Sequence, residues 1–174
     1  MKLNLNFLWL ISLGLVCIAG GFTWVGYQFT QEAGGKAIVL SGYEVFPSMA
    51  PILLLQAAAL VVSLLLSAGP KRILAIILAL CMGWHLAELI FIQVKLFEVA
   101  LNSSIAAVSG VAGQSAQQAL LASSNFSSTW IAYLVLGLVN VGVLGLVALG
   151  KNRVLKKEKT QESVSVGLWE QQRR

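Results

Sequence analysis

The chain has 174 residues, of which 57% are hydrophobic and 11% are charged, and its formal net charge is +5. Soluble domains carry about 25% charged residues, so this composition excludes an ordinary soluble protein and indicates an integral membrane protein. The two cysteines, Cys17 and Cys81, form no CxxC motif, which gives a redox or zinc function little support. We expect both thiols to behave as small apolar side chains, and we expect no cofactor.

The first apolar run covers residues 7–25 and leaves two interpretations open. A positive charge at Lys2 and small residues at 19–21 are typical of a cleaved signal peptide. The run continues past those small residues through Trp24, and this favours an uncleaved membrane span. In the loop that follows, the AIVLS stretch at 37–41 is expected to be a short strand or a segment that dips into the membrane interface.

Two further apolar runs, residues 49–67 and 73–92, are each long enough to cross a bilayer, since about 20 apolar residues span the hydrocarbon core. Only the stretch 68–72, Ala-Gly-Pro-Lys-Arg, separates them. So short a connection predicts a tight turn and an antiparallel helical hairpin.

The region 95–129 is rich in Ser, Ala and Gly, a composition that leaves a surface helix and disorder as alternatives. A fourth apolar run covers residues 130–149. It begins with Trp130 and Tyr133, which we expect to anchor the span at the membrane interface. Three glycines in this run are expected to let a neighbouring helix come close, namely Gly137, Gly142 and Gly145.

The spans and the charges together predict the architecture and its orientation. Residues 1–150 are expected to form one all-α domain, an integral membrane four-helix bundle, and residues 151–174 a disordered basic tail. Of the twelve Lys and Arg residues, only Lys36 and Lys95 fall on one side of this arrangement. Because positive residues accumulate in cytoplasmic loops, both termini are expected in the cytoplasm. The tail is expected to contact anionic lipid of the bilayer, and no nucleic-acid partner is needed to explain it.

Four polar side chains interrupt the spans and form a candidate intramembrane cluster: Gln56, His85, Glu88 and Asn140. His85 and Glu88 stand three residues apart on one helix, with Gln56 expected at a similar depth. Such ionisable groups are costly inside a membrane. Three roles stay open for the pair: structural hydrogen bonding, ligand binding or proton handling, and a metal site, for which one His and one Glu are few ligands. Asn140 is expected to join two helices.

The third span carries small residues on one side and polar residues on the other. The small residues recur every four positions and form a candidate packing seam: Ala75, Ala79, Gly83 and Ala87. The opposite side holds Cys81, His85 and Glu88. This pattern predicts a central helix that is buried on both sides or lines a cavity.

No motif for catalysis is present. The chain contains no P-loop, GxGxxG or HExxH sequence, and no arrangement of a nucleophile with His and an acid can be recognised. We therefore expect that the protein is not an enzyme.

The chain shares several short motifs with a known family. In chain order these motifs are Thr23-Trp24, Ser41-Gly42, Pro47, Pro51, Leu53-Leu54, Pro70-Lys71-Arg72 and Leu168-Trp169-Glu170. In length, number of spans and these motifs, the chain resembles the tryptophan-associated membrane proteins of actinobacteria, which are encoded beside tryptophan-biosynthesis genes. The resemblance implies a multi-pass protein of the bacterial plasma (inner) membrane and a role in the handling of tryptophan or its precursors. It implies no particular activity.

Two functions remain open at this stage. In the first, the protein is an accessory or scaffold protein for a membrane complex, and its tail docks a cytoplasmic or membrane partner through Leu168, Trp169 and Glu170. In the second, it is a carrier, or a carrier subunit, for a small solute such as an aromatic amino acid or precursor. The carrier would be a homo-oligomer that uses the intramembrane polar cluster.

Overall fold

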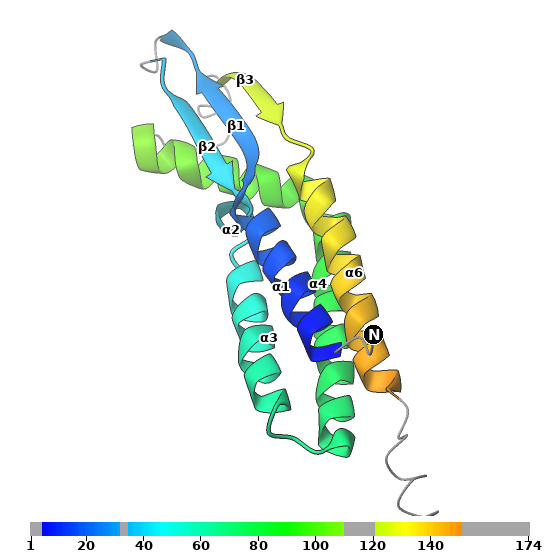
Figure 1. The fold of residues 1–174 in the computed structure, drawn as a ribbon. Coiled ribbons are helices and arrows are strands. Elements are labelled where there is room, and N and C mark those ends of the chain that lie inside the picture. The colour runs from blue at the N-terminus through cyan, green and yellow to red at the C-terminus, as the bar shows by residue number, and fades with distance from the viewer. Residues whose placement is uncertain (1–4, 32–34, 110–120, 151–174) are drawn as a thin grey trace, which may run out of the picture.

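A computed structural model describes residues 5–31, 35–109 and 121–150 of the chain (Figure 1). The described residues are mostly helical, as predicted, and they also include three strands. The elements in chain order are α1 (Leu5–Gly21), β1 (Thr23–Phe29), β2 (Ala37–Ser41), α2 (Gly42–Val45), α3 (Met49–Ser63), α4 (Ala68–Ser109), β3 (Leu121–Phe126) and α6 (Thr129–Leu149).

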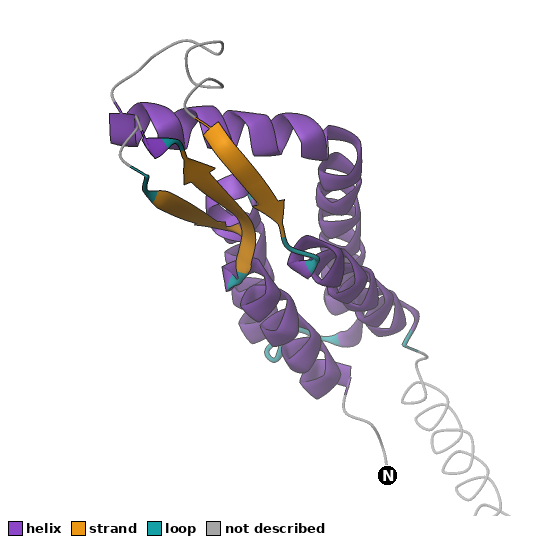
Figure 2. Cartoon of the chain, turned by 90° about the horizontal axis from the view of Figure 1, so that it is seen from above, coloured by secondary structure: helices purple, strands orange, loops and turns teal. Residues whose placement is uncertain are grey.

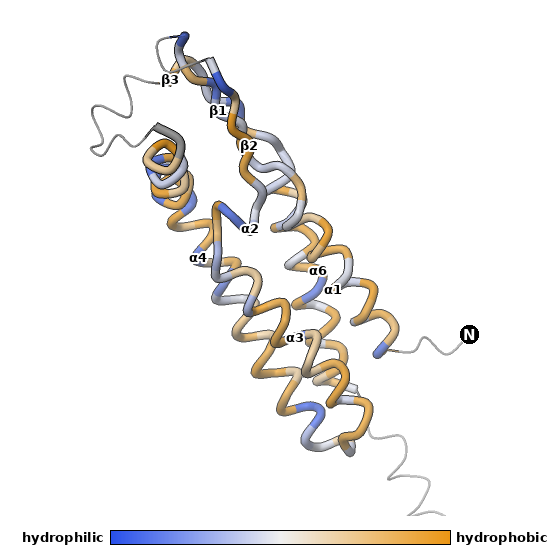
Figure 3. Tube along the Cα trace, turned by 90° about the vertical axis from the view of Figure 1, so that its left-hand side faces the viewer, coloured by the Kyte–Doolittle hydropathy of each residue, from blue (hydrophilic) through white to orange (hydrophobic). Residues whose placement is uncertain are grey.

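Helices α1, α3, α4 and α6 lie side by side and form a bundle (Figure 1). Helix α1 packs against α3 and α6, and α4 packs against the same two helices. The outer surfaces of all four helices remain apolar: Leu54 is 70% exposed, Trp84 76% and Leu138 61%. Colouring by hydropathy shows the same apolar character along the bundle (Figure 3). An apolar exterior of this extent is expected of a protein whose solvent is lipid.

Two of these helices are long and apolar enough to cross a membrane, namely Ala68–Ala107 of α4 and α6. Helices α1 and α3 are shorter apolar helices. Helix α3 ends at Ser63, so the turn to α4 lies at residues 64–67 and not at the predicted 68–72. Helix α6 begins one residue before the predicted start of the fourth span.

The prediction of an all-α fold is wrong because the loops pair with one another. Helix α1 ends at Gly21, and the last residues of the predicted span 7–25 belong to strand β1. The β1 sequence TWVGYQF is rich in aromatic and β-branched residues, which favour a half-buried strand. Both long loops of the predicted topology therefore contribute to one folded unit.

The sheet has the strand order β2-β1-β3, and both pairings are antiparallel. Gly26 of the central strand pairs with Val39 on one side and with Asn125 on the other. The predicted alternative of a strand at 37–41 is confirmed as β2. Strand β3 lies almost 100 residues after β1 in the chain and pairs with it. The local sequence pattern of neither strand predicts this pairing.

Helix α2 connects the sheet to α3. The carboxylate of Glu44 accepts hydrogen bonds from the Ser41 N–H and from the Ser41 hydroxyl, both at 2.7 Å, and these bonds fix the start of the helix. At Gly42 an added Cβ would lie 2.5 Å from the Trp24 ring and 2.8 Å from the Gly20 carbonyl oxygen. Only glycine therefore allows the chain to pass so close to Trp24.

Helix α4 extends well beyond the predicted third span. Its C-terminal part, residues 93–109, turns away from the bundle axis and runs alongside the sheet (Figures 1 and 2). We call these residues the arm. The Tyr27 hydroxyl of β1 donates a hydrogen bond to the Phe97 carbonyl at 3.3 Å and ties the arm to the sheet. The predicted loop at 95–129 is thus helical in its first part and a strand at 121–126.

The end of the bundle far from the sheet holds three segments of the chain together. Lys71, near the start of α4, donates a hydrogen bond to the Asn6 side chain at the start of α1. Arg72 donates to the Gly150 carbonyl at the end of α6. A guanidinium at this position also complements the negative end of the α6 helix dipole.

Candidate functional site

His85 lies fully buried in the core of the bundle. Its Nε2 atom shares a hydrogen bond with the Tyr133 hydroxyl at 3.0 Å, and its ring stacks on Phe46 with centroids 4.5 Å apart and planes 9° apart. The Nδ1 atom is buried and has no hydrogen-bond partner among the described residues. The imidazole thus joins α4 to α6 and to the segment before α3.

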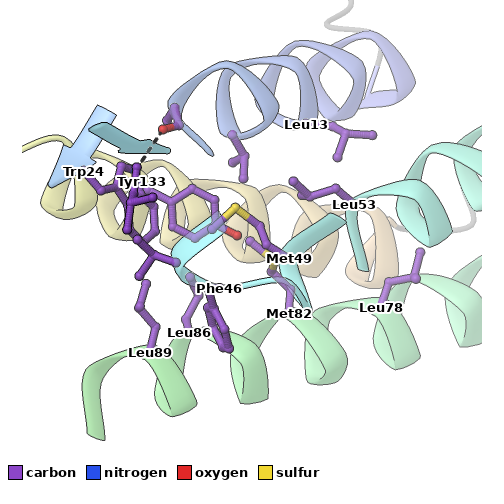
Figure 4. Packing of buried hydrophobic residues seen from close by; sticks show 14 of the residues in the cluster. Leu13, Trp24, Phe46, Met49, Leu53, Leu78, Met82, Leu86, Leu89 and Tyr133 are labelled. Atoms are coloured by element: carbon purple, nitrogen blue, oxygen red, sulfur yellow. Dashed lines mark hydrogen bonds between the residues drawn. The ribbon is translucent and has the colours of Figure 1, made fainter. Parts of the chain in front are cut away.

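Tyr133 is fully buried as well, so the prediction that it anchors α6 at a membrane interface is wrong. Its ring lies 5.3 Å from the Trp24 ring, and the two side chains appear side by side in Figure 4. Trp24 in turn donates from its indole N–H to the Ala19 carbonyl at 3.2 Å. This aromatic group closes the core where the bundle meets the sheet.

Asn140 joins two helices, the role that the sequence suggested for it. Its amide donates to the Ser12 hydroxyl of α1 at 3.0 Å, and Ser12 donates to the Trp9 carbonyl at 3.0 Å. The Asn140 carbonyl oxygen and the Trp9 indole nitrogen are buried without a partner in the described part of the chain.

Gln56 and Glu88 do not join His85. Gln56 is buried in α3, and neither its amide nitrogen nor its amide oxygen has a partner among the residues that the structure describes. Glu88 lies partly exposed one helical turn beyond His85, and no hydrogen bond between the two is found. No hydrogen bond therefore joins any two of the four predicted polar residues in the described part of the chain, and only His85 and Asn140 have a described side-chain partner.

The predicted packing seam on α4 is only partly buried. Ala75 is buried, whereas Ala79, Gly83 and Ala87 are half-buried. A Cβ added at Gly83 would meet no atom within 4 Å, so no helix packs closely there.

The close approach occurs instead at Gly137 of α6, where an added Cβ would lie 2.7 Å from a Leu86 methyl group and 3.2 Å from the Met82 terminal carbon. Leu86 and Met82 lie in the packed core shown in Figure 4. At Gly142 and Gly145 an added Cβ would have open space. Of the three glycines expected to allow close packing, only Gly137 does so.

The expectation that the third span is buried on both sides is wrong as well. Cys81 is exposed, Trp84 is 76% exposed and Phe91 is 86% exposed. The buried face of α4 lies between the predicted seam and the predicted polar stripe, and it carries large side chains: Leu78, Met82, His85, Leu86 and Leu89. Helix α4 therefore packs inward with one face and leaves the other outside.

A cavity of ≈ 480 Å³ lies between the sheet and the arm. Its lining comes from four separate elements: Tyr27 of β1; Gln93, Val94, Phe97, Glu98 and Leu101 of the arm; Leu121, Ser124 and Phe126 of β3; and Trp130 of α6. The Phe97 and Phe126 rings meet edge to face across it, with centroids 5.4 Å apart. Burial raises the pKa of Tyr27, so its phenol stays neutral and keeps donating to Phe97.

Sequence analysis did not identify the residues of this cavity. The sequence did carry one signal for Tyr27, namely the alternation of the aromatic residues Tyr27 and Phe29 with the polar Gln28. Such alternation is typical of a strand with one buried face, and in the structure Tyr27 and Phe29 are buried and Gln28 is exposed. The arm residues carried no comparable signal, since their role depends on the direction that α4 takes after the bundle. In the described residues no three His, Cys, Asp or Glu side chains gather as a metal-binding group. The predicted docking element Leu168, Trp169 and Glu170 lies outside the described residues.

Comparison with known protein families gives a match over most of the chain. Residues 7–161 match the family model described as tryptophan-associated transmembrane protein. No curated protein and no solved structure matches the chain.

Proposed function

The chain belongs to the family of tryptophan-associated transmembrane proteins, and we propose that it is a multi-pass plasma-membrane protein that serves tryptophan metabolism as a non-catalytic accessory protein. In this proposal α1, α3, α6 and the first part of α4 cross the bilayer. Both termini lie in the cytoplasm, and the sheet and the arm form a small folded head on the outer side.

The proposed orientation is supported by the positions of the Lys and Arg residues, most of which belong to one end of the bundle. Lys71 and Arg72 are held there against the start of α1 and the end of α6. Most other positive residues belong to the two termini that continue from this end. Only Lys36 and Lys95 belong to the opposite end, and the positive-inside rule then assigns the sheet and the arm to the outside.

The lengths of the helices are compatible with four spans. At about 1.5 Å per residue, the 21 residues of α6 cover the full hydrocarbon thickness of about 30 Å. Helices α1 and α3, with 17 and 15 residues, are shorter than this. A membrane accommodates such short helices by local thinning at a modest cost.

A non-catalytic role is supported by the surroundings of the histidine. Its described partners are Tyr133 and Phe46, which hold the imidazole in the packed core as a contact between elements of the bundle. The tail element Leu168–Glu170 remains our proposed docking segment for a cytoplasmic or membrane partner.

Cysteine labelling tests the orientation. In a background with Cys17→Ala and Cys81→Ala, we would place single cysteines at Ser123 of β3 and at Ser67 in the α3–α4 turn, both exposed in the structure. A maleimide that cannot cross membranes is expected to label Ser123→Cys in intact cells and Ser67→Cys only after lysis. The reverse pattern would overturn the proposed topology.

One observation favours the carrier alternative: the buried Gln56 amide has no described hydrogen-bond partner and could bind a solute. A carrier that uses the polar cluster requires Gln56 and Glu88, whereas an accessory protein that docks through its tail requires the last residues of the chain. We would therefore compare Glu88→Gln with deletion of residues 160–174 in cells that depend on this protein for growth on limiting tryptophan. Loss of growth only with the deletion supports the accessory role, and loss only with Glu88→Gln supports a carrier. Normal growth with both variants contradicts both functions.

A further inference from the structure

We propose that the cavity between the sheet and the arm binds a small aromatic compound that carries an ammonium group. The inference rests on the proposed function for the choice of indole compounds as probes, and it names the ligand class that the outer head would take. The size, the aromatic lining and the charge of the cavity each favour such a ligand.

The cavity has the dimensions of a small-molecule site. Its volume of ≈ 480 Å³ falls within the range of about 300–1,000 Å³ that is typical of ligand pockets. Its lining comes from β1, the arm, β3 and α6, which are brought together only by the complete fold. A site assembled from four separate elements is held in place by the sheet pairing and by the Tyr27–Phe97 hydrogen bond.

Each of the four elements that form the cavity contributes one aromatic side chain. Tyr27, Phe97, Phe126 and Trp130 all border the cavity. Phe126 is 54% exposed and is not part of the buried core, although Phe97, against which it packs, is buried. Aromatic rings stack on a planar ligand and also attract a cation over their faces. This combination fits an aromatic ring with an ammonium group attached.

The charge in the described lining of the cavity is negative. Among the described residues that border the cavity, Glu98 is the only carboxylate, and none of these residues is a Lys, Arg or His. A carboxylate can accept several hydrogen bonds at once, so Glu98 can receive an ammonium group in addition to its contact within the protein. Gln93 and Ser124 add two neutral polar side chains that can form hydrogen bonds. The lining therefore favours an ammonium group and disfavours a ligand whose only charge is a carboxylate.

A series of indole compounds separates these contributions. Binding of tryptamine, tryptophan, indole and indole-3-propionate would be measured by titration calorimetry on the full chain in nanodiscs of zwitterionic lipid. We expect tryptamine to bind about tenfold tighter than indole, since a desolvated cation–π contact with a carboxylate nearby is worth roughly one such factor. Tryptophan should fall between them, and indole-3-propionate should bind most weakly. Equal affinity for all four compounds would overturn the proposal.

Two substitutions locate the binding. Glu98→Gln is expected to reduce tryptamine affinity to that of indole while leaving indole affinity unchanged. Phe126→Ala is expected to weaken both compounds, whereas the matched control Phe91→Ala, at a strongly exposed position on α4 outside the cavity, should weaken neither. If Phe91→Ala and Phe126→Ala have the same effect, the binding is not in this cavity and the proposal fails.

Further controls keep the test decisive. If Glu98→Gln fails to fold, Ser124→Arg on the exposed strand β3 replaces it, because an added cation in the cavity should also weaken tryptamine selectively. Cyclohexylethylamine carries the ammonium group without an aromatic ring, and binding as tight as that of tryptamine would remove the aromatic part of the proposal. These measurements need neither cells nor a known topology, so their failure leaves the labelling and growth tests of the proposed function unaffected.

Discussion

The Nε2 atom of His85 and the hydroxyl of Tyr133 lie 3.0 Å apart and join α4 to α6 in the buried centre of the protein. The only histidine of the chain therefore shares a hydrogen bond with a tyrosine side chain of another helix. Glu88, three residues further along the same helix, is partly exposed. The bond is an interhelical contact at the end of the bundle that carries the sheet.

Removing the phenol oxygen is expected to destabilise the bundle modestly. In Tyr133→Phe, the buried Nε2 atom of His85 loses its partner, and a buried unpaired group costs about 1–3 kcal/mol in soluble proteins. Polar contacts between membrane helices average only ~0.6 kcal/mol, so we expect a loss near 1 kcal/mol. Thermal unfolding in detergent, followed by circular dichroism, measures this loss.

A double-mutant cycle with His85→Leu provides the control. Once His85 is replaced, the Tyr133→Phe substitution should cost markedly less than it does alone, because no unpaired imidazole remains. Costs that simply add would mean that the observed bond contributes nothing to stability.

Two glycines of the same helix are expected to differ in their tolerance of a larger side chain. Gly142→Ala meets no atom within 4 Å and should stabilise α6, since Ala is a better helix former than Gly. Gly137→Ala places its Cβ 2.7 Å from a Leu86 methyl group, which must move, so the gain should be lost. Gly137→Val, which is bulkier, should cost about 1–3 kcal/mol through overpacking.

The measurement is again thermal unfolding in detergent. Gly83→Ala on α4 is the matched test of the predicted seam, and we expect it to resemble Gly142→Ala because its surroundings are open. Strong destabilisation by Gly83→Ala together with a neutral Gly137→Val would reverse the packing described above.

Gly42 is expected to be the most sensitive glycine near the sheet. A Cβ at this position would lie 2.5 Å from the rigid, buried Trp24 ring and 2.8 Å from a backbone oxygen, and neither can move aside easily. Gly42→Ala should therefore cost about 1–3 kcal/mol or more and disturb the start of α2. Gly26→Ala is the control, since its Cβ would have only an ordinary contact with Ile38. Similar melting temperatures for the two variants would contradict this account.

Gln56→Leu separates stability from transport. The Gln56 amide is buried without a described partner, so an apolar side chain of similar volume should leave the stability unchanged within about 1 kcal/mol or raise it. If the protein is an accessory protein, growth on limiting tryptophan should also be unchanged. Normal stability with lost growth would instead favour the carrier alternative, and a strongly destabilised variant would mean that the amide is paired.

Several features could be predicted from the residues alone. The long apolar runs locate the helical segments because a chain with so few charges can satisfy its backbone in lipid only by regular secondary structure. The fourth run is an instance, since α6 begins at Thr129, beside the predicted start at residue 130. The AIVLS stretch was recognisable as a possible strand for a similar reason, because its branched residues fit a pleated surface.

The candidate sites were less predictable because they depend on rotation and direction. The sequence pattern placed Gly83 on one side of the helix and His85 and Glu88 on the other, but it did not give the face that turns inward. The inward face of α4 is the one that carries large side chains such as Met82 and Leu86, because these fill the space between α4 and α6. The side with the small residues is then only half-buried.

The sequence by itself determined the class of the protein, since 57% hydrophobic residues and 11% charged residues leave lipid as the natural environment of its helices. It also determined the orientation that we propose, through the unequal distribution of Lys and Arg. Only the tertiary structure decided that β1 pairs with β3 and that Tyr27, Phe97 and Phe126 border one cavity. These contacts join segments about 70 to 100 residues apart, and contacts of that kind depend on the whole packed chain and leave no trace in local periodicity.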